Sequence, residues 1–237
     1  MEELMQSSTV NRRHTVNEQY FTKIDSPEKA YWLGFLWADG NITKTAPRAS
    51  GPNRLRIAQK WAERKHLQEF LKALQSNYAF TCIHHTGGHD VAQLDINSRP
   101  MCESLEKLGY GTKSQRTQLP NIPNNLMSHF IRGYFDGDGC LSLYTQTIKK
   151  WTIKKQEWSL TGHHVLMENI QKTLTDQAGV TATVKLKYYK RSPETASLRY
   201  GKKADVVKLY DYMYQNATVY LSSKHQKFVE FFSRFAS

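Results

Sequence analysis

Two nine-residue stretches decide the fold: WLGFLWADG at residues 32–40 and IRGYFDGDG at residues 131–139. Each is an apolar, helix-like run that contains a glycine and ends in a small residue followed by Asp-Gly. The two aspartates of these endings, Asp39 and Asp138, are 99 positions apart. Similar segments at a fixed offset are the signature of an internal repeat. The sequence therefore predicts a duplicated unit.

The interior glycines of these stretches predict how the two units meet. A glycine inside a helix costs roughly 1 kcal/mol relative to alanine, so its presence at equivalent points needs a reason. Small residues recur every four positions in both stretches, as Ala30, Gly34 and Ala38 in the first and as Gly133 and Gly137 in the second. Small residues on one face let two helix backbones approach closely. We expect the two helices to pack together and to relate the repeats by a pseudo-twofold axis.

That packing would bring Asp39 and Asp138 together at two neighbouring helix C-termini. Each carboxylate would then face the negative end of a helix dipole and a second carboxylate, which is unfavourable without a cation. Mg²⁺ binds through a few carboxylates together with substrate phosphates. Asp-Gly is also an ordinary turn signal, but its recurrence at matched helix ends favours a metal site.

The flanking sequence repeats in the same order. A capped helix start at Ser26 opens the first unit, and hydrophobic spacing predicts helix-strand-strand-helix-strand-strand-helix in both units, with one further helix at the end of the chain. We expect an α+β fold, with residues 1–25 as a polar N-terminal arm, 26–120 as the first repeat and 121–237 as the second.

The charge of the chain indicates a polyanionic partner. The 237 residues contain 33 Lys and Arg against 21 Asp and Glu, a formal net charge of +12. Residues 141–203 contain 12 basic and 4 acidic residues and so hold +8 of it. Basic and apolar residues alternate in several strand-like stretches, which predicts sheets with one Lys/Arg face that could lie in a DNA groove. The expected DNA contacts are Arg54, Arg56, Lys185, Lys187 and Arg199.

Other classes of site and location are not expected. No run approaches the length of a membrane helix, and the polar N-terminus does not resemble a secretory signal. Three cysteines without a CxxC pair are expected to be free thiols in a reducing compartment, and not zinc ligands: Cys82, Cys102 and Cys140. The histidines around Gly87-Gly88 are expected in a solvent loop, with no cysteine or carboxylate set to complete a metal site: His84, His85 and His89.

The two Asp-Gly motifs resemble those of the LAGLIDADG homing endonucleases, specifically the single-chain members with two repeats. The resemblance covers the chain from about residue 26 to its end. It implies two αββαββα repeats with saddle-shaped antiparallel sheets and with the motif helices at their interface. It also implies a monomer that uses Mg²⁺ to make a staggered cut in a long, non-palindromic double-stranded DNA target. The implied location is intracellular, either the cytoplasm of a bacterial or phage-infected cell or an organelle.

The resemblance also assigns site residues. The metal-binding aspartates fall on Asp39 and Asp138, helped by the backbone carbonyl groups of Ala38 and Gly137. The first motif departs from the family at Trp37, where Asp is usual, but that position is not the metal ligand.

Two further family elements have candidates in each repeat. A polar residue that orders water near the end of a strand falls on Gln59, and the same place in the second repeat is Gly162. A basic residue near the scissile phosphate, just before the last helix of each half, falls on Lys113 and on Lys224. Ordinary helix-start lysines are the alternative for that pair.

Other functions remain open on the same scaffold. A nuclease-inactive DNA-binding regulator or an intron RNA maturase is the alternative, and loss of either motif aspartate would favour it. A self-splicing intein is not expected, because the chain begins with Met and ends in Phe-Ala-Ser without a His-Asn end.

Overall fold

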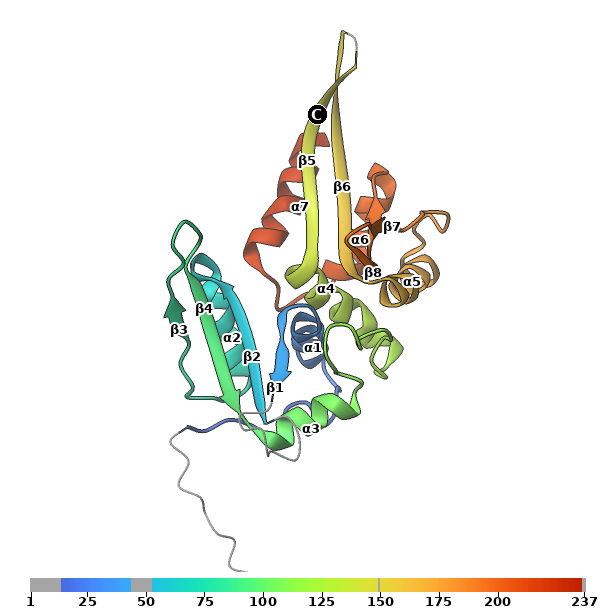
Figure 1. The fold of residues 1–237 in the computed structure, drawn as a ribbon. Coiled ribbons are helices and arrows are strands. Elements are labelled where there is room, and N and C mark those ends of the chain that lie inside the picture. The colour runs from blue at the N-terminus through green and yellow to red at the C-terminus, as the bar shows by residue number, and fades with distance from the viewer. Residues whose placement is uncertain (1–13, 44–52, 149, 236–237) are drawn as a thin grey trace, which may run out of the picture.

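The computed structural model describes residues 14–43, 53–148 and 150–235. Its first half has the predicted order of elements (Figure 1). The helices are α1 (Pro27–Asp39), the 3-10 turn η1 (Trp61–Glu63), α2 (Arg64–Ala73) and α3 (Arg99–Lys107). The strands are β1 (Asn41–Thr43), β2 (Arg54–Lys60), β3 (Thr81–Ile83) and β4 (Val91–Asn97).

The second half repeats this order and adds a C-terminal helix. Its helices are the 3-10 turn η2 (Asn124–Leu126), α4 (Met127–Asp138), α5 (His164–Thr173), the π-helical turn η3 (Leu174–Ala178), α6 (Lys203–Tyr214) and α7 (Ser222–Phe235). Its strands are β5 (Gly139–Ile148), β6 (Trp151–His163), β7 (Lys187–Tyr189) and β8 (Ser192–Tyr200).

Each half contains one four-stranded antiparallel sheet, and the two sheets have equivalent strand orders. These orders are β1-β2-β4-β3 and β5-β6-β8-β7. The registers also correspond, because Gln59 pairs with Ala92 in the first sheet and Gly162 pairs with Ala196 in the second. The predicted α+β fold of two similar repeats is confirmed.

The two motif helices pack backbone to backbone at the centre of the molecule (Figure 1). A Cβ atom added to Gly34 would lie 1.9 Å from the carbonyl oxygen of Phe130, and one added to Gly133 would lie 2.0 Å from that of Tyr31. Only glycine fits at both points. The predicted close helix contact is confirmed, and it explains why both helices tolerate an interior glycine.

Ser26 caps α1 as expected, since its Oγ accepts a hydrogen bond from the Lys29 amide. The residues just before it do not behave as a polar arm. Tyr20, Phe21 and Ile24 are buried, because this segment packs its apolar side chains on the first half; residues 1–13 of the expected arm lie outside the described residues.

The second sheet differs from the first in size. Its β5–β6 hairpin is the longest in the described chain and projects beyond the helices (Figure 1). Of the two lysines expected on a basic strand face, Lys187 lies in β7, whereas Lys185 precedes that strand. Among the described helices, none is long and apolar enough to cross a membrane.

Candidate active site

The aspartates at the ends of α1 and α4 lie at the junction of the two halves. A Cβ atom added to Gly137 would be 2.4 Å from the Cβ of Ala38 and 3.2 Å from Oδ2 of Asp39. The Asp39 carboxylate therefore lies against the last turn of α4, the turn that also carries Asp138. Both side chains are half-buried. The structure thus places the two predicted metal ligands at one point.

The electrostatics of this point are unfavourable for two anions. Burial raises the pKa of Asp39 to about 6, and the Asp138 carboxylate adds to the increase, against the lowering effects of Lys113, Gln59 and Lys224. Burial also raises the pKa of Asp138 above its usual value, again opposed first by Lys113. Two desolvated carboxylates that disfavour their own ionisation are a donor set that fits a divalent cation.

Backbone carbonyl groups complete this set of oxygens. Ala38 and Gly137 belong to the last turns of their helices, where carbonyl groups have no partner within the helix. Their oxygens could therefore serve as ligands beside the two carboxylates.

The two halves surround their aspartates differently. Gln59 Nε2 donates a hydrogen bond to Oδ2 of Asp39 over 2.6 Å. At the equivalent strand position, the space beside Gly162 is filled by Tyr134, whose hydroxyl would lie 2.3 Å from an added Cβ and donates to the Thr161 carbonyl. An amide thus contacts the first carboxylate, while a tyrosine hydroxyl occupies the corresponding space in the second half.

The two predicted lysines also lie in different settings. Lys113 Nζ is 3.8 Å from Oδ2 of Asp138, whereas Lys224 Nζ donates to the carbonyl oxygen of Gly139. Lys224 lies in the first turn of α7. The expected position of Lys113 just before a helix is wrong, because Lys113 lies in a turn that follows α3. On either side of this turn, Tyr110 and Arg116 bond to carbonyl oxygens at the end of α1.

An arginine that sequence reasoning missed caps the first motif helix. Arg116 is buried and donates to the carbonyl oxygens of Trp37 at 2.7 Å and of Gly40 at 2.8 Å. Its guanidinium lies 3.9 Å from the ring centre of Tyr110, whose hydroxyl donates to the Leu36 carbonyl. This cation neutralises the negative end of the α1 dipole directly behind Asp39. Arg116 is 79 positions from Trp37 in the sequence, so no local sequence pattern indicates that it caps α1.

Two positions before Asp138, α4 carries a structural aspartate. Asp136 is buried and accepts hydrogen bonds from the Tyr31 hydroxyl at 2.7 Å, from the Tyr214 hydroxyl at 3.2 Å and from the Leu221 amide at 2.6 Å. Tyr31 belongs to the first half, so this carboxylate links the halves. The equivalent Trp37 is also buried, which explains how the first motif accommodates a tryptophan there.

The predicted DNA-contact residues lie on the outer faces of the sheets or beside them. Three arginines are ion-paired within those faces: Arg56 Nε lies 2.7 Å and Arg54 Nε 3.9 Å from Oδ1 of Asp95, and Arg199 lies 3.0 Å from Glu157. Lys185 and Lys187 are exposed. The lysines therefore offer more available charge than the arginines.

Two small cavities flank the aspartate pair. One of about 360 Å³ is lined by residues that include Lys113, Asp138 and Gly162. The other, of about 410 Å³, is lined by residues that include Gln59 and Lys224. Each cavity is thus lined by one of the two predicted lysines and by one of the two equivalent strand positions, Gln59 or Gly162. This correspondence agrees with the internal repeat.

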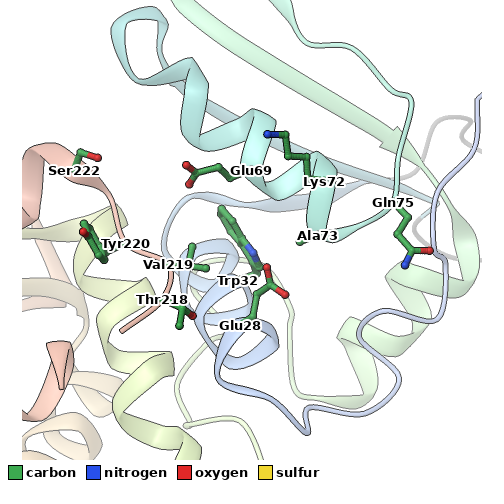
Figure 2. Close-up of a pocket in the computed structure, with 10 residues that line it drawn as sticks. All are labelled: Glu28, Trp32, Glu69, Lys72, Ala73, Gln75, Thr218, Val219, Tyr220 and Ser222. Carbon is green, nitrogen blue, oxygen red and sulfur yellow. The ribbon is translucent and has the colours of Figure 1, made fainter. Parts of the chain in front are cut away.

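A third cavity lies apart from them. It has a volume of about 650 Å³, and Figure 2 shows that its wall combines residues of α1 and α2 with the segment 218–222. Its α1 residues include Glu28, about 16 Å from Asp39 at the helical rise of 1.5 Å per residue. This cavity is therefore separate from the aspartate pair.

No family model matches the chain. A stretch of 125 residues, 52% of this chain, is 28% identical to reverse gyrase of Methanocaldococcus jannaschii, and the match spans only 7% of the length of that protein.

Solved structures match nearly the whole chain. The LAGLIDADG meganuclease I-AabMI bound to uncleaved DNA is 14% identical with a TM-score of 0.61, over 90% of this chain and 92% of that one. I-CpaMI bound to uncleaved DNA is 12% identical with a TM-score of 0.58, over 87% and 90% of the two chains. The I-LtrWI homing endonuclease bound to target DNA is 10% identical with a TM-score of 0.58, over 92% of both. The chain therefore has the fold of the LAGLIDADG homing endonucleases, as its two motifs predicted.

Proposed function

We propose that the protein is a site-specific endonuclease that cuts double-stranded DNA by metal-dependent phosphodiester hydrolysis. The observation that carries this proposal is the convergence of Asp39 and Asp138 at two packed helix ends between two sheets. The DNA-bound state of structurally similar meganucleases supports DNA as the partner. We further propose that residues 26–120 and 121–237 act as two half-sites of one monomer and that the cut is staggered.

The chemistry divides among named groups. Asp39, Asp138 and the carbonyl oxygens of Ala38 and Gly137 would hold Mg²⁺, which when bound activates water and stabilises the leaving oxygen. Gln59 holds the Asp39 carboxylate in position and, through its amide oxygen, can accept a hydrogen bond from a nearby water. Lys113 lies close enough to the carboxylate pair to contact a phosphate bound there, and it would stabilise developing negative charge.

The alternative of a nuclease-inactive DNA- or RNA-binding protein shares the scaffold but does not need the carboxylates. Both motif aspartates are present, and their half-buried carboxylates lie close together, which lowers the stability of the folded protein. DNA binding alone would not require two carboxylates at this unfavourable place. This cost favours the nuclease.

A cleavage selection tests the proposal. A randomised duplex library is incubated with the protein and Mg²⁺, and the cut ends are sequenced. We expect one long, non-palindromic consensus with staggered ends. Retention of a specific sequence without any cut ends would favour the binding protein instead.

A further inference from the structure

The turn between β3 and β4 brings together three side chains that the sequence did not connect. His84 Nδ1 lies 3.1 Å from Oδ1 of Asp90 and 4.0 Å from Sγ of Cys82. One ligand atom from each residue lies within 4.8 Å of the other two. The expectation that no cysteine or carboxylate accompanies the histidines of this loop is wrong, because the hairpin folds Asp90 back onto Cys82.

The strand register explains this convergence. Cys82 pairs with Ala92 and Ile83 pairs with Val91, so the next opposed positions are His84 and Asp90. Side chains alternate between the two faces of a sheet. Cys82, His84 and Asp90 therefore project from the same face of the hairpin, and the backbone itself brings them together.

Nδ1 of His84 faces both the Asp90 carboxylate and the Cys82 thiol. In the neutral ring one nitrogen carries a lone pair, so with the proton on Nε2 the Nδ1 lone pair is directed at the point between the other two ligand atoms. Tetrahedral zinc, with bonds of about 2.0–2.3 Å, separates nitrogen, oxygen and sulfur ligands by roughly 3.3–3.6 Å. The separations of 3.1 and 4.0 Å from Nδ1 of His84 bracket this range. All three ligand atoms lie within 4.8 Å of one another, so side-chain adjustment at the exposed hairpin would bring them to it.

We propose that Cys82, His84 and Asp90 bind one Zn²⁺ ion, separate from the aspartate pair, and that this ion fixes the tip of the β3–β4 hairpin. A thiolate and an imidazole select zinc over Mg²⁺, which prefers oxygen ligands. His84 and Asp90 are 77% and 42% exposed, so the ion can enter from solvent and a water can complete its coordination.

The surroundings indicate what the ion would do. Zn²⁺ binds cysteine as the thiolate, so its binding would release the proton of the Cys82 thiol. The carbonyl group of Asp90 accepts a hydrogen bond from the Trp61 amide over 2.7 Å. The ion would therefore fix the hairpin tip next to the turn that begins α2.

Cobalt substitution tests the proposal directly. The full-length protein is titrated with Co²⁺, and a thiolate-to-cobalt charge-transfer band is expected to saturate at one ion per chain and to disappear on addition of Zn²⁺. Cys82→Ser should abolish the band. It should also weaken Zn²⁺ binding by more than about 100-fold, since even outer-sphere partners of metal ligands contribute 10- to 100-fold.

The matched control is Cys140→Ser. Cys140 is exposed and lines a cavity next to the aspartate pair, so this variant separates the hairpin from the active site, and its band should remain. Asp90→Asn serves as a second ligand variant if Cys82→Ser does not fold, and it should weaken Zn²⁺ binding while His85→Ala does not. Absence of the band in the wild-type protein, its persistence in Cys82→Ser or its loss in Cys140→Ser would overturn the proposal. None of these measurements depends on nuclease activity.

Discussion

Under the proposed function, cleavage depends on the aspartate pair, whereas DNA binding depends on the basic side chains of the sheets. Asp39→Asn or Asp138→Asn should abolish double-strand cleavage, because an amide replaces a charged metal ligand. DNA binding should stay largely intact, because the basic faces of the sheets are unchanged. Gel-shift and cleavage assays on the same duplex separate the two effects. Wild-type cutting of both strands by either variant would show that the pair does not hold the metal.

The same carboxylates should destabilise the metal-free protein. The pKa of Asp39 is raised to about 6 from an ordinary value near 4. Between about pH 4 and pH 6, the folded state therefore binds more protons than the unfolded state. Stability therefore falls as pH rises through about 4–6, and the full penalty persists above pH 6.

Asp39→Asn should remove that penalty. Without metal at pH 7.5, we expect a gain of about 1–3 kcal/mol in the free energy of unfolding, after allowance for partial solvent exposure. The asparagine oxygen can still accept the hydrogen bond from Gln59. Urea denaturation at pH 7.5 and at pH 4 measures the effect, which should shrink at the lower pH. Equal gains at both pH values would contradict an origin in ionisation.

The different neighbours of the two aspartates predict unequal strand cutting. Gln59→Ala removes an amide that contacts Asp39, whereas Gly162 offers no side chain for the corresponding role. We expect Gln59→Ala to slow one strand more than the other, so that nicked plasmid accumulates. A duplex with each strand end-labelled separately gives the two rates. Equal rates in wild type and in Gln59→Ala would exclude this pair of positions as the source of asymmetry.

At the scale of elements, the contact between α1 and α4 holds the site together. Gly34→Ala would place a methyl group 1.9 Å from the Phe130 carbonyl oxygen, and no rotamer change relieves a clash with backbone. We expect a loss of about 3 kcal/mol or more, above the usual range for overpacking. Gly201→Ala is the control, because its nearest contact would be an ordinary 3.7 Å. Similar denaturation midpoints for the two variants would contradict the close packing.

The sequence predicted those elements whose signals are local. The Ser26 cap, the interior glycines and the Asp-Gly endings fixed both motif helices, and alternation identified the sheet faces. Contacts between distant segments were not predictable. Arg116 caps a helix from 79 positions away at Trp37, and Asp136 bonds to Tyr31 across 105 positions. Nothing in the sequence near these residues distinguishes them from an ordinary surface arginine or turn aspartate.

The whole molecule is strongly basic, and its DNA affinity should depend on salt accordingly. With a net charge of +12, neutralisation of about 6–10 phosphates would lower the affinity on the order of 10³-fold or more between 50 and 200 mM salt. Fluorescence anisotropy with a labelled target duplex gives the slope of log affinity against log salt. A nearly flat response would remove DNA as the partner.

A basic residue should contribute to the slope of log affinity against log salt only when its charge is not already paired with a carboxylate of the protein. Lys187 is exposed in β7, an edge strand of the second sheet, so Lys187→Ala should reduce the slope by about 0.9, the release of one counterion. Arg56 is paired with Asp95, which Arg54 also approaches. The double variant Arg56→Ala/Asp95→Ala removes one positive and one negative charge, so it keeps the net charge and should leave the slope unchanged. A loss of affinity for the cognate target alone would then assign that pair to base recognition. An equal change of slope in both variants would instead show that Arg56 leaves Asp95 to bind phosphate.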